Sequence, residues 1–438
     1  MSSPLQNKTA PFIVSVIARL QSEGYEAYIV GGAIRDFMLG REPKDYDVST
    51  SATPEQVRRV FRDRRCIIIG RRFRLVHLYC GSSIVEISTF RRSPGDAQTR
   101  PRRAADAPEH MIFQDNEFGT AEDDAHRRDF TVNALFYDPV NDRILDYTGM
   151  GEPDIRAGLV RSIGEPALRF EEDPVRILRA LKLVGQYGFR LEEKTGEALM
   201  KCMPLIVHAS VSRLTLELEK ILKNPYGDAI LTTFRKYGFL GYFLPALDER
   251  FDTPAARYMM SLFAARNEHV RQGKYRASMS LVLALFTLPF VEEYFGGEPG
   301  GLWNVVPDME ELFRRQLLAV MHPHAVTRRD NANAVSNLIL QTRFRRGEGL
   351  ERYYGAACYP NARELAALQN EVMWHMDDFE TLCPARPEGV PFSSKSSRRR
   401  SRRRFRKHGG DAQAKPDGTV RREEDGGESA APERIGAS

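Results

Sequence analysis

The stretch that decides the fold is Tyr28-Ile-Val-Gly-Gly-Ala-Ile-Arg-Asp-Phe-Met-Leu-Gly-Arg-Glu-Pro-Lys-Asp-Tyr-Asp-Val-Ser49. Its first three residues are apolar, which predicts a strand, and two glycines separate them from a helix-like segment, Ala33 to Leu39. Gly31 and Gly32 have no side chain to keep a triphosphate away from backbone N–H groups at a helix start. Arg35, one turn further on, is placed to contact the same phosphates.

The same stretch ends in a pair of acidic residues, Asp45 and Asp47. In a strand, residues two apart point to one face, so the two carboxylates are expected side by side. Like charges that close repel each other, and divalent cations relieve the repulsion. Mg²⁺ typically takes one or two carboxylates together with phosphate oxygens, so we expect Asp45 and Asp47 to be metal ligands. Taken alone, such a pair is also compatible with an ordinary solvated turn.

Two further segments combine charged residues with helical signals. Residues 122–135 begin as a polar helical turn and continue as an amphipathic helix, with Arg128, Asp129 and Asn133 on the polar side. Residues 169–182 place Asp173 before a proline, a typical helix start, and repeat arginine at positions 176 and 179 on one face. A helix with a surface ion pair and a capped basic helix are the plain structural alternatives.

Together these segments resemble the class II nucleotidyltransferases, the family of CCA-adding tRNA nucleotidyltransferases and bacterial poly(A) polymerases. The resemblance covers residues 25 to 225. It implies a third metal-site carboxylate in a strand, for which Glu86 in Ile84 to Phe90 is the candidate. It also implies that Asp129 accepts hydrogen bonds from ribose hydroxyls, while Arg128 and Asn133 hold sugar or phosphate. Two Mg²⁺ ions and ATP, as substrate, follow from the same resemblance.

The family's base-reading motif is present as Glu172, Asp173, Arg176 and Arg179. A carboxylate beside a guanidinium matches the amino donor and ring-nitrogen acceptor of adenine and of cytosine. Guanine and uracil present a carbonyl in place of the amine, and a buried mismatch costs about 1–3 kcal/mol per unpaired group. The Asp173–Arg176 pair therefore predicts selection of A or C without separating them, and Arg179 is the better candidate for a phosphate contact.

The choice between poly(A) and CCA addition depends on weaker features. Ile68 to Leu78, with Arg71 and Arg72, resembles a signature of bacterial poly(A) polymerases. Lys395 to Lys407 contains nine Lys or Arg in thirteen residues, too charged to form a core and suited to sequence-independent RNA binding. The arginines predicted there to bind RNA are Arg398, Arg399, Arg400, Arg402, Arg403 and Arg404. The sequence favours AMP addition to RNA 3′ ends, with CCA addition and a non-catalytic RNA-binding protein as alternatives.

Composition limits the architecture and the partners. The 438 residues are 42% hydrophobic and 28% charged, which predicts a soluble protein of two to four domains. Residues 391–438 hold thirteen Lys or Arg against seven Asp or Glu, so the net charge of +5 belongs to the tail. Five scattered cysteines, no run of 18 apolar residues and a polar start favour the cytoplasm, without membrane contact. RNA-degradation and RNA-chaperone proteins are the candidate partners, and the sequence does not specify which.

The expected fold class is α+β. A nucleotidyltransferase head with a mixed β-sheet and helices spans residues 1–164, and all-α segments follow. These are a neck of base- and RNA-binding helices over 165–245, a helical body and tail over 246–385, and a disordered basic tail over 386–438.

Overall fold

The computed structural model describes residue 5 and residues 9–43, 45–70, 74–81, 83–92, 117–297 and 308–392. The chain divides after Val390, and residues Met1–Val390 form one compact unit. The predicted RNA-binding residues Arg71 and Arg72 and the arginines of the basic tail lie outside the described residues.

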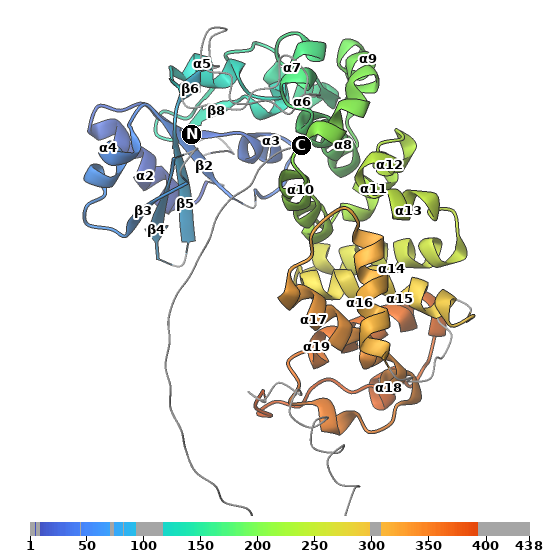
Figure 1. Ribbon diagram of the computed structural model, residues 1–438. Helices are drawn as coiled ribbons and strands as arrows, with labels where there is room; N and C mark the ends of the chain where they lie inside the picture. Colours follow the sequence, from blue (N-terminus) through green and yellow to red (C-terminus); the bar gives the residue numbers. More distant parts are fainter. Residues whose placement is uncertain are drawn as a thin grey trace, which may run out of the picture. The chain divides into compact units, whose positions relative to one another are not determined.

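A mixed sheet forms the N-terminal part (Figure 1). Its seven strands are β1 (Ala27–Val30), β2 (Asp47–Thr50), β3 (Cys66–Ile69), β4 (Leu75–Cys80), β5 (Ser83–Thr89), β8 (Phe136–Asp138) and β9 (Arg143–Leu145). Their order is β3-β4-β5-β2-β1-β8-β9, and only the β2–β5 pair is parallel. Two small ribbons pair β6 (Arg91–Arg92) with β7 (Glu117–Phe118), and β10 (Leu159–Val160) with β11 (Arg190–Leu191).

The two faces of this sheet differ because residues alternate along each strand. Val48 and Ile87 are buried in one cluster with α2 (Pro11–Ser22) and α4 (Pro54–Val60). On the other face, Val30 and Phe136 pack under α5 (Ala121–His126). Helix α4 begins with a capping box, because Thr53 and Gln56 form both of its hydrogen bonds.

The rest of the described chain is mostly helical, which confirms the α+β class. Its helices are α6 (Gly151–Ala157), α7 (Pro166–Glu172), α8 (Val175–Tyr187), α9 (Glu193–Cys202), α10 (Val211–Lys223), α11 (Gly227–Lys236), α12 (Leu240–Phe243), α13 (Pro245–Glu249), α14 (Pro254–Arg271), α15 (Met279–Tyr294), α16 (Met309–Met321), α17 (Arg328–Ile339), α18 (Gln341–Arg346), α19 (Tyr359–Gln369) and α20 (Phe379–Leu382). Short irregular helical turns occur at η1 (Thr131–Asn133), η2 (Met203–His208), η3 (Leu350–Tyr353) and η4 (Asn370–Trp374).

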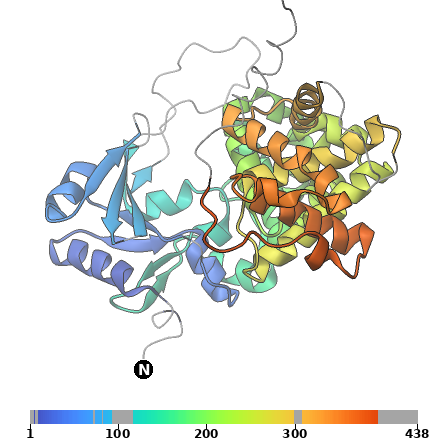
Figure 2. The ribbon, with the colours of Figure 1, turned by 90° about the horizontal axis from the view of Figure 1, so that it is seen from below.

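Helix α15 is the centre of the C-terminal bundle, seen among the yellow and orange helices of Figure 2. Every residue from Ser280 to Glu292 is buried, since α10, α14, α16, α17 and α19 all pack against this helix. No helix of the described residues is both long enough and apolar enough to cross a membrane.

One expected element is wrong. Residues 122–135 do not continue as a single amphipathic helix, because α5 ends at His126 and only the short turn η1 follows. The Asp129 carboxylate accepts a hydrogen bond from the backbone N–H of Phe130 (2.9 Å), and Phe130 forms an isolated β-bridge with Ser162. A side chain that caps its own backbone in this way competes with helix formation.

Candidate active site

Three polar side chains occupy one row across strands β2, β5 and β4. Asp47 is opposite Glu86 in the parallel register, and Glu86 is opposite His77 in the antiparallel one. Glu86 is exposed between the buried Val85 and Ile87, as its alternation predicts, and Oε1 of Glu86 lies 3.3 Å from Nε2 of His77. The sheet therefore places the predicted carboxylates Asp47 and Glu86 side by side.

Asp45 reaches this site in a different way from the one expected. Strand β2 begins at Asp47, so Asp45 precedes the strand, and the i, i+2 geometry of a strand does not apply to it. Its charge nevertheless acts on Asp47. Reduced hydration of Asp47, followed by repulsion from Glu86 and from Asp45, raises the pKa of the Asp47 carboxyl. Part of the Asp47 residue is nevertheless exposed to solvent.

Asp47 therefore lies among like charges that a cation would neutralise. Arg128 and Lys220 act in the opposite direction and favour its charged form. The described residues contain no group of three or more His, Cys, Asp or Glu side chains arranged to hold a metal ion. A carboxylate pair is still a fitting donor set for Mg²⁺, because phosphate oxygens and water complete its coordination.

The turn between β1 and α3 (Gly32–Met38) brings an arginine close to the backbone. Gly31 has φ +76°, and a Cβ there would lie 3.3 Å from Nη1 of Arg128. Arg128 is held by Asp124 through Nη2 (2.8 Å) and donates from Nη1 to the carbonyl oxygen of Asn133 (3.2 Å). Its guanidinium lies 5.2 Å from the ring centre of Phe136, the residue paired with Val30 in the row that contains Asp47.

Arg35 contacts the site through another side chain. It is buried, and its Nη1 donates to Oδ1 of Asn133 (2.6 Å) while Nη2 donates to the hydroxyl of Tyr187 (2.6 Å). Nδ2 of Asn133 in turn donates to Oδ1 of Asp129 (3.2 Å). Arg35 therefore orients the predicted ribose contact Asp129, and a direct contact between Arg35 and phosphate stays a prediction.

Direct contacts join the sheet region to helices α7 and α8. Arg179 on α8 forms an ion pair with Asp129 (Nη1 to Oδ2, 3.6 Å). Arg169 on α7 is buried and donates from Nη2 to the carbonyl oxygens of Arg127 (2.6 Å) and Arg128 (2.9 Å). The helix that carries the predicted base-reading residues is therefore tied to the segment that carries the predicted ribose contact.

Asp173 and Arg176 have different hydrogen-bond partners, and their predicted joint contact with the base stays a prediction. Arg176 donates from Nη1 to Glu172 (2.9 Å) and to the carbonyl oxygen of Arg169 (2.7 Å). Asp173 accepts two hydrogen bonds from Arg213 on α10, at 3.1 and 2.8 Å. Burial opposes the charge of Asp173, but Arg213, together with the charges of Arg176 and Arg179, outweighs burial and lowers the pKa of this carboxyl.

Arg213 is the site residue that sequence reasoning missed. Its position four residues before Glu217 indicates an intrahelical ion pair, but the structure pairs it with Asp173, 40 residues away. One signal was available in the sequence. Arg213 stands at the start of a helix, and Asp173 stands before another helix as a carboxylate that a cation would stabilise.

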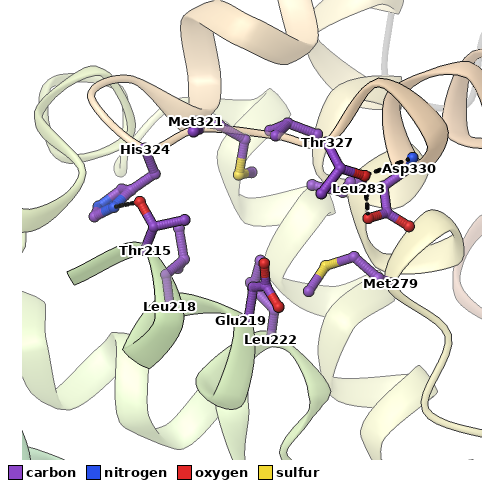
Figure 3. Close-up of a pocket in the computed structure, with 12 residues that line it drawn as sticks. Thr215, Leu218, Glu219, Leu222, Met279, Leu283, Met321, His324, Thr327 and Asp330 are labelled. Carbon is purple, nitrogen blue, oxygen red and sulfur yellow. Dashed lines mark hydrogen bonds between the residues drawn. The ribbon is translucent and has the colours of Figure 1, made fainter. Parts of the chain in front are cut away.

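The opposite side of α10 borders a small pocket that contains none of the predicted site residues (Figure 3). Leu218 and Leu222 line it from α10, and Met279 and Met321 line it from the bundle. At its edge, Nε2 of His324 donates to the carbonyl oxygen of Phe243 (2.7 Å), and Thr215 lies 3.3 Å from Nδ1 of the same ring. Burial lowers the pKa of His324, and its two contacts join α10 to α12.

Comparisons with known proteins agree with this arrangement. Residues 27–161 match the family described as poly A polymerase head domain, and residues 188–251 match the probable RNA and SrmB-binding site of polymerase A. Poly(A) polymerase I of Haemophilus influenzae is 39% identical over 277 residues, which are 62% of this chain and 60% of that protein. A CCA-adding enzyme of Geobacillus thermodenitrificans is 37% identical over 257 residues, 58% of this chain and 60% of the relative.

Among solved structures, the CCA-adding enzyme of Bacillus stearothermophilus in complex with CTP has a TM-score of 0.58 at 25% identity. The superposition covers 87% of this chain and 82% of that enzyme. The matches to the curated relatives span about 60% of their length. By these matches, and by the motifs that carry the site, the chain is similar to the class II nucleotidyltransferases, the family of poly(A) polymerases and CCA-adding enzymes.

Proposed function

We propose that this chain is a template-independent RNA nucleotidyltransferase that adds AMP from ATP to RNA 3′ ends, a poly(A) polymerase. The observation that carries the proposal is a continuous set of contacts from the sheet to the helices. Arg128 contacts Asn133, Asn133 contacts Asp129, and Asp129 contacts Arg179 of α8. One nucleotide can therefore meet the carboxylates with its phosphates and the helices with its base. The Haemophilus influenzae relative, a poly(A) polymerase I, supports adenylate addition over the alternatives.

Magnesium fits the donor set, which consists of carboxylate oxygens in a region of like-charge repulsion. Asp47 and Asp45, with Glu86 beside them, are the residues that would hold two Mg²⁺ ions. When bound, such ions lower the pKa of the RNA 3′-hydroxyl and stabilise the charge of the leaving pyrophosphate.

The remaining roles belong to side chains of the chain itself. Asp129, oriented by Asn133, would accept hydrogen bonds from the ribose hydroxyls, and Arg128 would contact phosphate beside Gly31. Asp173, fixed by Arg213, would accept from the amino group of the base. Basic residues outside the described part of the chain, Arg71, Arg72 and those of the tail, would bind RNA without regard to sequence.

The proposal is tested by extension of a generic RNA with ATP alone and with CTP alone. Asp47→Asn should reduce AMP addition by at least about 100-fold, because it removes a carboxylate that holds the metal. RNA affinity, measured by fluorescence anisotropy, should remain within about twofold, since Asp47 opposes rather than attracts phosphates. Asp63→Asn is the matched control: this exposed carboxylate pairs with Arg19 on α2. Full extension by Asp47→Asn would overturn the assignment.

The second candidate function is CCA addition to tRNA. The solved structure named above, a CCA-adding enzyme with CTP, favours it. Incorporation of CMP by the unmodified chain, on tRNA ending before CCA but not on other RNA, would replace the first proposal with this one. No incorporation of either nucleotide would leave RNA binding alone as the activity.

A further inference from the structure

A single buried carboxylate, Glu217 on α10, gathers three cations. Nζ of Lys220 lies 3.2 Å from Oε1 of Glu217, and Nζ of Lys182 lies 3.5 Å from Oε2. Nη2 of Arg179 completes the set at 3.8 Å from Oε1. We call these four residues the Glu217 cluster.

The Glu217 cluster carries more positive charge than its own carboxylate neutralises. Of the three cations, Arg179 also meets Asp129. Burial, followed by repulsion from Lys220 and Arg179, lowers the pKa of Lys182 even though Glu217 acts to raise it. Cations that repel one another and outnumber the neighbouring carboxylates are stabilised when a further anion binds.

The donors of the Glu217 cluster remain accessible. The side chains of Arg179, Lys220 and Lys182 are 43%, 63% and 22% exposed, and each lysine has hydrogen-bond donors beyond the contact with Glu217. An ion pair that only stabilises a helix needs one cation for its carboxylate. Additional ion pairs with exposed cations typically contribute little to the free energy of unfolding. Packing alone therefore does not explain why three cations converge on one carboxylate.

The Glu217 cluster also lies beside the nucleotide site. Arg179 bridges Glu217 and the predicted ribose contact Asp129, and Lys220 is within electrostatic reach of Asp47. A phosphate that bound here would therefore be close to both the sugar contact and the metal carboxylates.

We propose that Lys182 and Lys220, positioned by Glu217 together with Arg179, form a phosphate-binding subsite on the α8–α10 side of the active site. The ligand is a phosphate group, and it has two possible sources: the triphosphate of ATP and the 3′-terminal backbone of the RNA. This inference rests on the proposed nucleotidyl transfer, which brings both phosphates into one site.

The test measures binding without turnover, in the full chain with Asp47→Asn as background. Lys182→Gln and Lys220→Gln are each added, and affinity is measured for ATP, for adenosine and for a labelled 15-nucleotide oligo(A) across a salt series. Lys223→Gln is the matched control, because Lys223 lies on the same helix and pairs with Glu219 at 3.6 Å. Lys220→Arg restores the charge, and thermal melting confirms that each variant is folded.

If the subsite takes the triphosphate, each lysine variant loses about tenfold in ATP affinity and nothing in adenosine affinity. If it takes the RNA backbone, oligo(A) affinity falls and the salt slope decreases by about one per lysine. In both cases Lys220→Arg recovers most of the loss. Variants that match Lys223→Gln for all three ligands would overturn the subsite. Failure of the proposed function would appear separately, as an unmodified chain that binds these ligands but extends no RNA.

Discussion

At the scale of single residues, the least expected contact is the one between Asp173 and Arg213. Two parallel hydrogen bonds fix the orientation of a carboxylate more firmly than a single contact does. Asp173 also accepts a hydrogen bond from the backbone N–H of Val175 (3.2 Å), so both its oxygens are held before any base arrives. Pre-organisation of this kind favours a base whose donor meets a fixed acceptor.

Replacing Arg213 with glutamine should therefore loosen nucleotide choice. We expect the ratio of kcat/KM for ATP to that for GTP to fall about five- to tenfold, since the mismatch of guanine costs less when Asp173 can move. The measurement is extension of the same RNA from each nucleotide alone. Lys223→Gln, which removes one positive charge from the same helix, should leave the ratio unchanged. A uniform loss of activity with an unaltered ratio would mean that Arg213 only stabilises the helix.

At the scale of elements, the chain shows which features a sequence can reveal. The capping box of α4 involves residues three apart, so the sequence alone was sufficient to predict it. The exposed Glu86 in β5 followed from alternation between two buried neighbours. The partner of Arg213 was not predictable, because Glu217 lies one turn away and Asp173 becomes a partner only when α8 and α10 pack. Asp45 was misplaced for a similar reason, since the first residue of a strand depends on pairing with its neighbours.

Tyr187, at the end of α8, connects two elements of the candidate site. Its hydroxyl accepts from Nη2 of Arg35 (2.6 Å) and donates to Oδ1 of Asp36 (2.8 Å). Two guanidiniums lie close to its ring, those of Arg35 and Arg41, at 4.3 and 4.7 Å from the ring centre. The tyrosine thus sets the position of α3 relative to α8.

Removing this hydroxyl with Tyr187→Phe should weaken ATP binding. The ring and its cation–π contacts stay, but Arg35 loses a partner and holds Asn133 less firmly. An unsatisfied buried donor costs about 1–3 kcal/mol, so we expect KM for ATP to rise about five- to tenfold with a smaller change in kcat. Tyr226→Phe is the control, because this ring also lies near Arg41 (5.0 Å). Equal kinetics for the two variants would contradict the coupling.

At the scale of the whole molecule, one core cluster runs from α2 in the N-terminal part to α19 in the bundle. Because the core is continuous, a change of charge or packing in the bundle affects the stability of the whole unit. The bundle contains an unusual buried group, Arg266 on α14, which is 0% exposed and has Nε and Nη2 without hydrogen-bond partners. Glu364 on α19 is the carboxylate whose charge acts on it.

Glu364 should make the stability of the protein depend on pH. Burial raises its pKa to about 7 from 4.5, although Arg266, Arg363 and His269 favour the charged form. Between these two values the folded chain holds a proton on Glu364 that the unfolded chain has lost. The contribution of protonated Glu364 to the free energy of unfolding is therefore complete below about pH 4.5 and is lost as the pH rises through about 7. The loss amounts to about 3 kcal/mol.

Glu364→Gln keeps a neutral side chain of the same shape at every pH. The variant should match the unmodified chain in thermal midpoint at pH 5 and exceed it by a few degrees at pH 7.5, because only the original residue must ionise against burial. Glu380→Gln is the control, since this glutamate on α20 is 80% exposed. Each variant is melted across pH 5 to 8. Subtracting the thermal midpoint of the unmodified chain at the same pH removes the contribution of all other titrating groups. A constant difference across that range would mean that Glu364 is already ionised in the fold and that Arg266 is its partner.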